Sequence, residues 1–321
     1  MTEVDSNELP PWAKGFCMGD GNQVRVRGFR DCFAGEIRGL DLSRTLSPAI
    51  LKTVREAWAE FPVLCFPDQP LDVDALESFT AQIGPFGNDP FIEPMQGHPN
   101  VLEVRRGPDE KGIVFGAAWH SDWSFQECPP SATLLQAKIV PPIGGDTLFA
   151  DCRRAWKSLP DDLKRIALRC HAIHSAKFAY GTSGTLAKDQ NPREMKILTS
   201  EKAHQTRLHP MVRTHPVTGL NALFVNPVYT TGVDGMSKEN GRAFLDQIYE
   251  HIVQDEYLYR HNWREDMLLM WDNRCVIHNA EGGYEGHARL MYRTTVAGEK
   301  PVDPTVDEEP IQFQSGRNHG A

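Results

Sequence analysis

Apolar residues recur along the chain in two patterns, which predict a few helices and many short strands. A spacing of about three to four positions lines one face of a helix, whereas short apolar or alternating runs between turn-forming residues are typical of strands. Ser47, Asp72 and Ser237 stand where an N-cap is expected, and Pro160 interrupts one helical stretch. The predicted helices are residues 48–60, 72–82, 152–170 and 237–253.

The predicted strands are short and fall into two sets, with helices at the ends. They lie at residues 35–42, 63–66, 101–104, 114–115, 133–140, 147–149, 208–214, 222–225, 267–271, 274–278 and 289–296. A parallel βαβ sheet would instead require strands and helices to alternate along the chain. The pattern therefore favours a mainly β fold with flanking helices, built on a jelly-roll core.

Composition divides the chain into one domain and two terminal segments. Residues 1–22 are polar and rich in glycine and proline, which predicts an N-terminal arm, and residues 303–321 are polar and acidic, which predicts a disordered tail. Residues 23–302 are expected to form a single domain. Within it, residues 181–205 hold few large apolar groups, so this long loop is interpreted either as a mobile lid or as a tolerated surface insertion.

Charge and cysteine usage exclude several classes of partner. The net charge of −9 and the pI near 5.7 argue against binding to nucleic acid or to an anionic membrane surface. The seven cysteines are scattered and form no C-x-x-C pair, so neither a disulfide framework nor a zinc knuckle is indicated. The polar start does not resemble a secretory signal, and no apolar run is long enough to span a bilayer. We therefore expect a cytoplasmic protein with reduced thiols.

The segment Trp119-His120-Ser121-Asp122 contains the first candidate metal ligands of the chain. Residues two apart on an extended segment point the same way, so His120 and Asp122 would offer an imidazole and a carboxylate to one point. These are two of the three ligands in the facial triad that binds non-haem iron(II). The triplet alone is a weak signal, because the spacing also arises by chance.

Two later segments strengthen the prediction of a metal site. His278 ends a strand-like run and can join His120 and Asp122 only through folding. In a strand over residues 289–296, Arg289 and Arg293 share one face. Guanidinium groups that face an interior are costly unless anions meet them, and they match carboxylates with paired hydrogen bonds. The two arginines therefore predict anionic ligands beside the metal.

Taken together, these segments resemble the TauD/TfdA family, the taurine and 2,4-dichlorophenoxyacetate dioxygenases. The resemblance implies a double-stranded β-helix, which is a cupin-like jelly roll, and an activity that depends on Fe(II) and on 2-oxoglutarate as cosubstrate. It runs from about residue 28 to residue 301. It is carried by residues 34–42, Trp119-His120-Ser121-Asp122, residues 141–149, 209–216 and 223–226, Trp271-Asp272-Asn273-Arg274, His278, and the pair Arg289 and Arg293.

The resemblance also implies roles for individual residues. It implies that His120, Asp122 and His278 are the catalytic iron ligands. Thr147 and Arg289 would hold the distal carboxylate of 2-oxoglutarate, and Arg293 would lie near the other end of the cosubstrate and near the acidic group of a substrate.

Two further positions are candidates for substrate contact. Asp89 stands where sulfonate-using members carry a histidine, so it would repel a sulfonate and could receive an amine or a hydroxyl; a turn-forming aspartate before Pro90 is the alternative. Tyr229 falls where family members carry an aromatic residue beside the substrate, with plain packing as the alternative. Phe178 and Tyr180 are weaker candidates.

The implied reaction hydroxylates an unactivated C–H bond of a small, acidic substrate, with 2-oxoglutarate and O2 converted to succinate and CO2. Desaturation, or cleavage of a C–N, C–O or C–S bond in an amino-acid-like substrate, is the alternative outcome. Two alternatives belong to other classes: a zinc hydrolase, since the same ligand types suit catalytic zinc, and a non-catalytic protein that binds a small acid. Family members are often oligomers, which leaves a homodimer or a homotetramer as the options.

Overall fold

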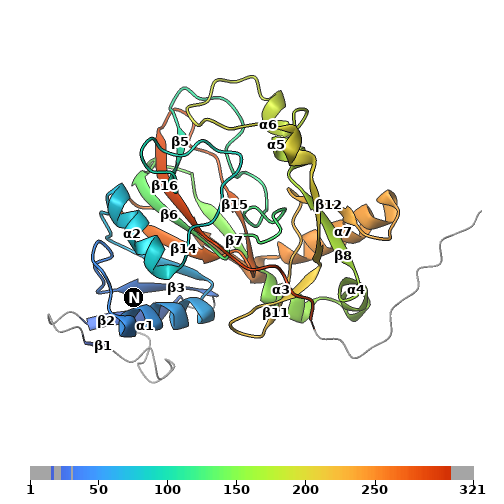
Figure 1. Cartoon of the computed structure of the whole chain (residues 1–321), viewed down its shortest axis with the longest axis horizontal. Coiled ribbons are helices and arrows are strands. Elements are labelled where there is room, and N and C mark those ends of the chain that lie inside the picture. Colours follow the sequence, from blue (N-terminus) through green and yellow to red (C-terminus); the bar gives the residue numbers. More distant parts are fainter. Residues whose placement is uncertain (1–15, 18–22, 30–31, 305–321) are drawn as a thin grey trace, which may run out of the picture.

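The computed structural model describes residues 16–17, 23–29 and 32–304 (Figure 1). Most of the predicted arm at residues 1–22, and the predicted tail from residue 305 onward, lie outside the described residues. In the described part of the chain, strands are more numerous than helices, which flank them. The predicted architecture, mainly β with flanking helices, is confirmed.

One large sheet forms the main layer of the molecule. Strands distant in sequence are neighbours in it, because β14 lies between β4 and β6, and β16 lies between β6 and β5. All pairings are antiparallel except that of β3 with β4. In spatial order the strands are β1 (Phe16–Cys17), β2 (Gln23–Gly28), β3 (Ala34–Arg38), β4 (Val63–Phe66), β14 (Leu268–Asp272), β6 (Ala132–Ile139), β16 (Arg289–Val296) and β5 (Leu102–Arg106).

Smaller sheets complete the β architecture. A three-stranded sheet has β7 (Thr147–Asp151) between β13 (Leu258–His261) and β15 (Val276–Ala280). Another has β8 (His171–Ser175) between β12 (Thr230–Val233) and β9 (Thr206–Pro210), and β10 (Val212–Thr214) pairs with β11 (Asn221–Leu223). Trp271 of the large sheet meets Phe149 of β7 with ring centroids 5.5 Å apart, so the large sheet and the β7 sheet share one core.

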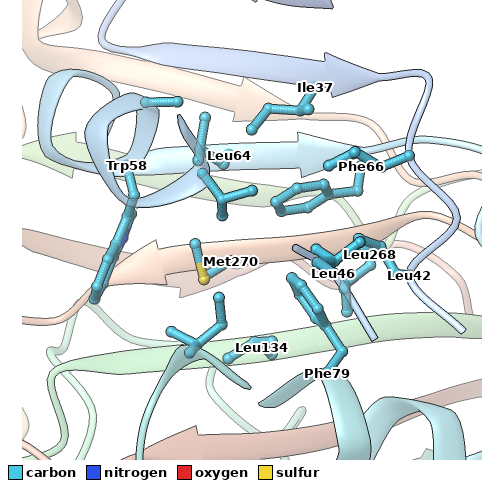
Figure 2. Packing of buried hydrophobic residues seen from close by; sticks show 14 of the residues in the cluster. Ile37, Leu42, Leu46, Trp58, Leu64, Phe66, Phe79, Leu134, Leu268 and Met270 are labelled. Carbon is cyan, nitrogen blue, oxygen red and sulfur yellow. The ribbon is translucent and has the colours of Figure 1, made fainter. Parts of the chain in front are cut away.

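Both faces of the large sheet are buried, as β14 illustrates. Leu268 and Met270 point to one face, where α1 (Pro48–Glu60) and α2 (Val73–Ile83) cover them (Figure 2). Leu269 and Trp271 point to the other face, toward the interior. A strand buried on both faces reads as an unbroken apolar run, which is the pattern of residues 267–271.

The other helices lie mainly around the smaller sheets. An apolar cluster packs residues of β8, β10 and β11 against the helices α3 (Cys152–Ser158), α4 (Asp161–Ala167) and α7 (Lys238–Ile252). The helix α7 also packs on β12 (Figure 1). None of the helices in the described ranges has the length and hydropathy that a membrane crossing requires. The elements are α3 (Cys152–Ser158), α4 (Asp161–Ala167), α5 (Lys177–Tyr180), α6 (Thr185–Lys188), α7 (Lys238–Ile252) and the 3-10 helices η2 (Glu201–His204) and η3 (Asp255–Tyr257).

The capping predictions are confirmed, and some strand predictions are wrong. Ser47, Asp72 and Ser237 each accept a backbone N–H three residues on. Residues 114–115 form no strand but lie in a loop, and β1, β2, β8, β12 and β13 were not predicted. A run of two residues is too short to show the alternation of apolar and polar positions that indicates a strand. In β8 the histidines obscure that alternation. Residues 181–205 contain α6 and η2, so they are not structureless.

A buried charged cluster fixes the β10–β11 hairpin to the end of β14. His215 donates from Nε2 to Oδ2 of Asp272 at 2.9 Å, and Arg274 donates to both carboxylate oxygens at 2.8 and 2.7 Å. Burial alone would raise the pKa of Asp272, but the charge and hydrogen bonds of Arg274, aided by His215, hold the pKa well below its usual range.

The core packing between α2 and the large sheet predicts a large loss of stability on truncation. Phe79 is fully buried against Phe66, with ring centroids 5.7 Å apart. Phe79→Ala should lower the free energy of unfolding by about 3–5 kcal/mol, through lost burial and the cavity left behind. Urea denaturation measures the change. Leu208→Ala, at a residue that is 52% exposed, should change it by less than about 1 kcal/mol, and equal losses would contradict the packing argument.

The pKa shift of Asp272 predicts a dependence of stability on pH. The folded-state pKa of Asp272 lies below the unfolded value of about 3.9, so the ionised carboxylate contributes its full stability above that pH. This stability decreases as the pH falls below about 3.9 and is lost once the pH has fallen through the folded-state pKa. Asp272→Asn should therefore destabilise by about 3 kcal/mol at neutral pH and by about 1 kcal/mol less near pH 3, as followed by urea denaturation. Asp68→Asn, at an exposed ion pair, should show little effect at either pH. A loss at Asp272 that is independent of pH would contradict the prediction.

Candidate active site

His120, Asp122 and His278 meet at one point in the interior. The backbones of His120 and His278 form an isolated antiparallel bridge, with reciprocal N–H to O=C hydrogen bonds of 2.9 and 2.7 Å. The Nε2 atoms of His120 and His278 lie 3.6 and 3.9 Å from Oδ1 of Asp122. One donor atom from each residue lies within 4.8 Å of the others. This donor set fits a non-haem iron(II) ion.

Hydrogen bonds orient the side chains of His120 and Asp122. His120 donates from Nδ1 to the carbonyl oxygen of Ala118 at 2.7 Å, which in the neutral imidazole leaves Nε2 unprotonated. Thr133 donates from Oγ1 to Oδ2 of Asp122 at 2.6 Å, and the Asp122 backbone N–H donates to Oδ1 of Asn273 at 3.3 Å. The contacts therefore leave Nε2 of His120 and Oδ1 of Asp122 turned toward the common point.

Protonation in the triad suits a metal. Burial alone would raise the pKa of Asp122, but the charge of Arg293, with His278 and His120, holds it well below its usual range. Burial, reinforced by the proximity of His120, lowers the pKa of His278 to about 3. At neutral pH the carboxylate is therefore charged and the His278 imidazole is neutral, which are the forms that bind metal ions.

The chain turns sharply after Asp122. Trp123 has a φ of 48°, a left-handed conformation that is uncommon outside glycine. The turn sends the Trp123 indole away from the triad, where its Nε1 donates to Oδ1 of Asp89. The side chains of these adjacent residues therefore contact different groups. Asp122 faces His120 and His278, whereas Trp123 faces Asp89.

The structure places Arg293 between two carboxylates. Its Nη1 donates to Oδ1 of Asp89 at 2.8 Å, and its Nη2 lies 3.2 Å from Oδ1 of Asp122. Asp89 also accepts a hydrogen bond of 2.9 Å from Oγ1 of Thr295. Direct contact of Asp89 with a substrate stays a prediction, but the contacts of its carboxylate are all with protein donors.

Arg289 is buried without an anion. Among the described residues no carboxylate lies in ion-pair range of it, and its Nε has no hydrogen-bond partner. Burial lowers its pKa, with only a small opposing effect from Tyr284. A buried guanidinium in this state is costly unless a ligand supplies the anion. The surroundings of Arg289 therefore fit the carboxylate of a bound acid such as 2-oxoglutarate.

Thr147 lies two residues after a backbone position that passes Arg289, and on the same strand face as His278. A Cβ built on Gly145 would lie 3.5 Å from Nε of Arg289, so the backbone at Gly145 runs past the guanidinium. Thr147 pairs with Ala280, two residues after His278, and side chains two apart share a face. The Thr147 hydroxyl accepts a hydrogen bond of 3.0 Å from the indole of Trp263 and keeps its own proton to donate.

A pocket of about 250 Å³ opens beside His120. Tyr229 packs edge-on against His120, with ring centroids 6.1 Å apart, and forms part of the pocket wall with Tyr180. Apart from His120, no titratable acid or base among the described residues lines it except these two phenols. Burial raises the pKa of both tyrosines, so both remain neutral. The apolar lining includes Ile113, Val114, Phe115, Phe178, Leu186 and Val228.

Thr133 and Asn273 orient the triad but were not identified from the sequence. Asn273 accepts from the Asp122 backbone and donates from Nδ2 to Oγ1 of Thr133 at 2.9 Å. The motif at residues 271–274 was noted as part of the family likeness, yet nothing in it indicates which atom Asn273 contacts. Thr133 lies in a predicted strand, and only the fold brings its hydroxyl to Asp122.

Comparison with known proteins identifies the family. The family described as "Taurine catabolism dioxygenase TauD, TfdA family" matches residues 25–295. The chain is 30% identical to the alpha-ketoglutarate-dependent 2,4-dichlorophenoxyacetate dioxygenase of Burkholderia sp. (strain RASC), over 84% of this chain and 92% of that protein. It is also 30% identical to the alpha-ketoglutarate-dependent sulfate ester dioxygenase of Pseudomonas putida, over 83% of this chain and 87% of that protein.

A solved structure supports the same fold and chemistry. The structure of AAD-2 in complex with Mn(II) and N-oxalylglycine is similar with a TM-score of 0.70 and 29% identity, covering 87% of this chain and 98% of that one. The predicted double-stranded β-helix is thereby confirmed, and the zinc hydrolase and the non-catalytic binder are not supported. A small-molecule substrate and O2 suit such an enzyme. The chain belongs to the TauD/TfdA family and is an iron(II)- and 2-oxoglutarate-dependent dioxygenase.

Proposed function

We propose that His120, Asp122 and His278 bind the iron(II) and form the catalytic centre. Their convergence from two distant segments supports this assignment, because the three donor atoms approach one point within 4.8 Å. The hydrogen bonds of His120 and Asp122 direct their remaining donor atoms to that point. Among the described residues, the buried cluster of His215, Asp272 and Cys275 has similar ligand types, but its histidine and carboxylate already bond each other.

The distal carboxylate of 2-oxoglutarate is assigned to Thr147 and Arg289. The observation that carries this proposal is the buried, unpaired guanidinium of Arg289. A carboxylate there would neutralise the charge and could accept hydrogen bonds from Arg289 and from the Thr147 hydroxyl. Arg293 is assigned to the opposite end of the cosubstrate site, since it already lies against Asp122. In that position Arg293 also holds the carboxylate of Asp122 in place.

Substrate is assigned to the pocket beside His120. When bound, iron and 2-oxoglutarate supply the oxidation of a substrate C–H bond, coupled to formation of succinate and CO2. The chain contributes placement, because the Tyr229 ring and the apolar wall exclude water and fix which carbon lies nearest the triad. Hydroxylation is the proposed outcome. Desaturation or cleavage of a C–N, C–O or C–S bond is the alternative, which depends on that placement.

The domain boundaries, the cellular location and the oligomeric state are proposed from the sequence. Residues 23–302 are proposed to form one domain, in which residues 181–205 act as a lid, since Thr185 and Leu186 line the pocket. A reducing cytoplasmic location agrees with the buried, unbridged cysteines at 65, 152, 170 and 275. A homodimer or a homotetramer is proposed as the assembly.

Anaerobic titration of metal-free protein with Fe(II) and then 2-oxoglutarate tests the assignments. We expect a weak visible charge-transfer band in the wild type and none in His278→Ala. In Arg289→Ala the apparent affinity for 2-oxoglutarate should fall by about ten-fold or more, because a charge-assisted pair is lost. Arg105→Ala, on the neighbouring strand and 44% exposed, is the matched control and should resemble the wild type. A folded wild type that binds iron without a band would refute the proposal.

The hydroxyl of Thr133 should influence metal affinity through Asp122. Thr133→Val keeps the shape but removes the 2.6 Å hydrogen bond, and should weaken Fe(II) binding about 10- to 100-fold. Thr294→Val is the control, because that buried hydroxyl instead bonds Thr80 at 2.8 Å on the helix-covered face. Competition with a metallochromic chelator measures both affinities. Equal effects in the two variants would show that Thr133 acts only on stability.

A further inference from the structure

Three protein donors surround the carboxylate of Asp89. Arg293 and Trp123 donate to Oδ1, and the hydroxyl of Thr295 donates to Oδ2. The Asp89 side chain is only 10% exposed. A guanidinium, an indole N–H and a hydroxyl around one buried carboxylate form an anion-binding cradle, and here the anion belongs to the chain itself. We call Arg293, Trp123 and Thr295 the Asp89 cradle.

Two carboxylates of the chain already flank the charge of Arg293. Asp89 and Asp122 both lie in ion-pair range of its guanidinium, at 2.8 and 3.2 Å. One face of the guanidinium lies over the Trp123 ring, 5.3 Å from the centroid. An additional anion would therefore meet two carboxylates as well as one cation, and like charges at short range are strongly unfavourable in a buried site.

Among the described residues, none of those lining the pocket is an aspartate, glutamate, lysine or arginine. Neither Asp89 nor Arg293 is part of its lining, and the Trp123 ring packs on Tyr180 and Tyr229, which do line it, with centroids 5.5 and 6.5 Å away. At the entrance, Ile113 and Phe178 are 43% and 53% exposed. A molecule entering from solvent thus passes apolar side chains and reaches neutral phenols beside His120.

We propose that Asp89 determines substrate specificity by filling the anion cradle, so that the pocket takes uncharged, largely apolar substrates. The inference rests on the proposed function, since it takes the pocket beside the triad as the substrate site. The charges then balance without the substrate: iron(II) and two arginines offset Asp122, Asp89 and the two carboxylates of 2-oxoglutarate. This proposal differs from the acidic substrate and the amine contact expected from the sequence, because Asp89 is engaged by protein donors and lies outside the pocket lining.

The first test asks whether the cradle binds an external anion once Asp89 is shortened. Thermal unfolding of the full chain is followed with sodium acetate and, at equal ionic strength, with sodium chloride. Asp89→Ala should unfold at a lower temperature than the wild type, and acetate should restore part of the loss whereas chloride should not. Asp89→Asn keeps the shape and should respond less to acetate. Asp74→Ala, at a side chain that is 87% exposed, is the matched control and should show no specific response.

Acetate could also bind at Arg289, so only the response in excess of the wild type counts. The same series is repeated with 2-oxoglutarate present to compete at Arg289. An excess response in Asp89→Ala supports the cradle, even if the iron titration of the wild type fails. Equal responses in wild type and Asp89→Ala would overturn the cradle, even if that titration succeeds. The two proposals can therefore fail separately.

The second test compares two probes that share the chlorophenyl ether and differ by one carboxylate group, 4-chloroanisole and 4-chlorophenoxyacetate. Anaerobic calorimetric titration of the enzyme with Mn(II) and 2-oxoglutarate should give about ten-fold or more tighter binding of the neutral probe. In Asp89→Ala, affinity for the anionic probe should rise by about the same factor while affinity for the neutral probe changes little. A wild type that prefers the anionic probe, or a variant that changes both affinities equally, would contradict the assignment.

Discussion

The site depends on one pair of backbone hydrogen bonds, between His120 and His278. His120 lies in a loop and His278 in β15, so no continuous strand pairing holds the two together. The bridge nevertheless fixes both histidines at the backbone, before any side-chain contact is considered. Asp122 follows by chain connectivity, and its orientation is set by Thr133 on β6 and by Asn273 in the turn after β14. A triad anchored in this way is arranged for a metal before the metal arrives.

The large sheet supplies the rigid support for the remaining residues. Because α1 and α2 cover one face and the interior core covers the other, β6 and β16 cannot shift without disturbing two sets of contacts. β16 carries Arg289 and Arg293 on its interior face, and β6 carries Thr133. A shift of one residue in register would turn all these side chains to the helix-covered face. Burial on both faces therefore protects the geometry of the site as well as the stability of the fold.

Sequence patterns predicted what depends on local periodicity and on chain order. The capped helices, the apolar run at residues 267–271 and the His120–Asp122 spacing were all recognised locally. The meeting of His278 with these two residues needed the family likeness, since spacing cannot establish contact. The contacts of Asp89 were the hardest to predict from the sequence. They depend on the turn at Trp123 and on β16, whose Arg293 lies 204 positions after Asp89.

Asp89 lies in the loop after α2, outside β15, which carries His278, and outside β16, which carries both arginines. Its carboxylate nevertheless supplies one of the two negative charges around Arg293. The electrical character of the substrate site is thus controlled from a peripheral loop, whereas the oxidising machinery is built on the scaffold. During divergence within such a family, a single change in this loop can alter which ligands are tolerated without requiring the strands to change. Catalytic chemistry and ligand preference are therefore free to evolve at different rates.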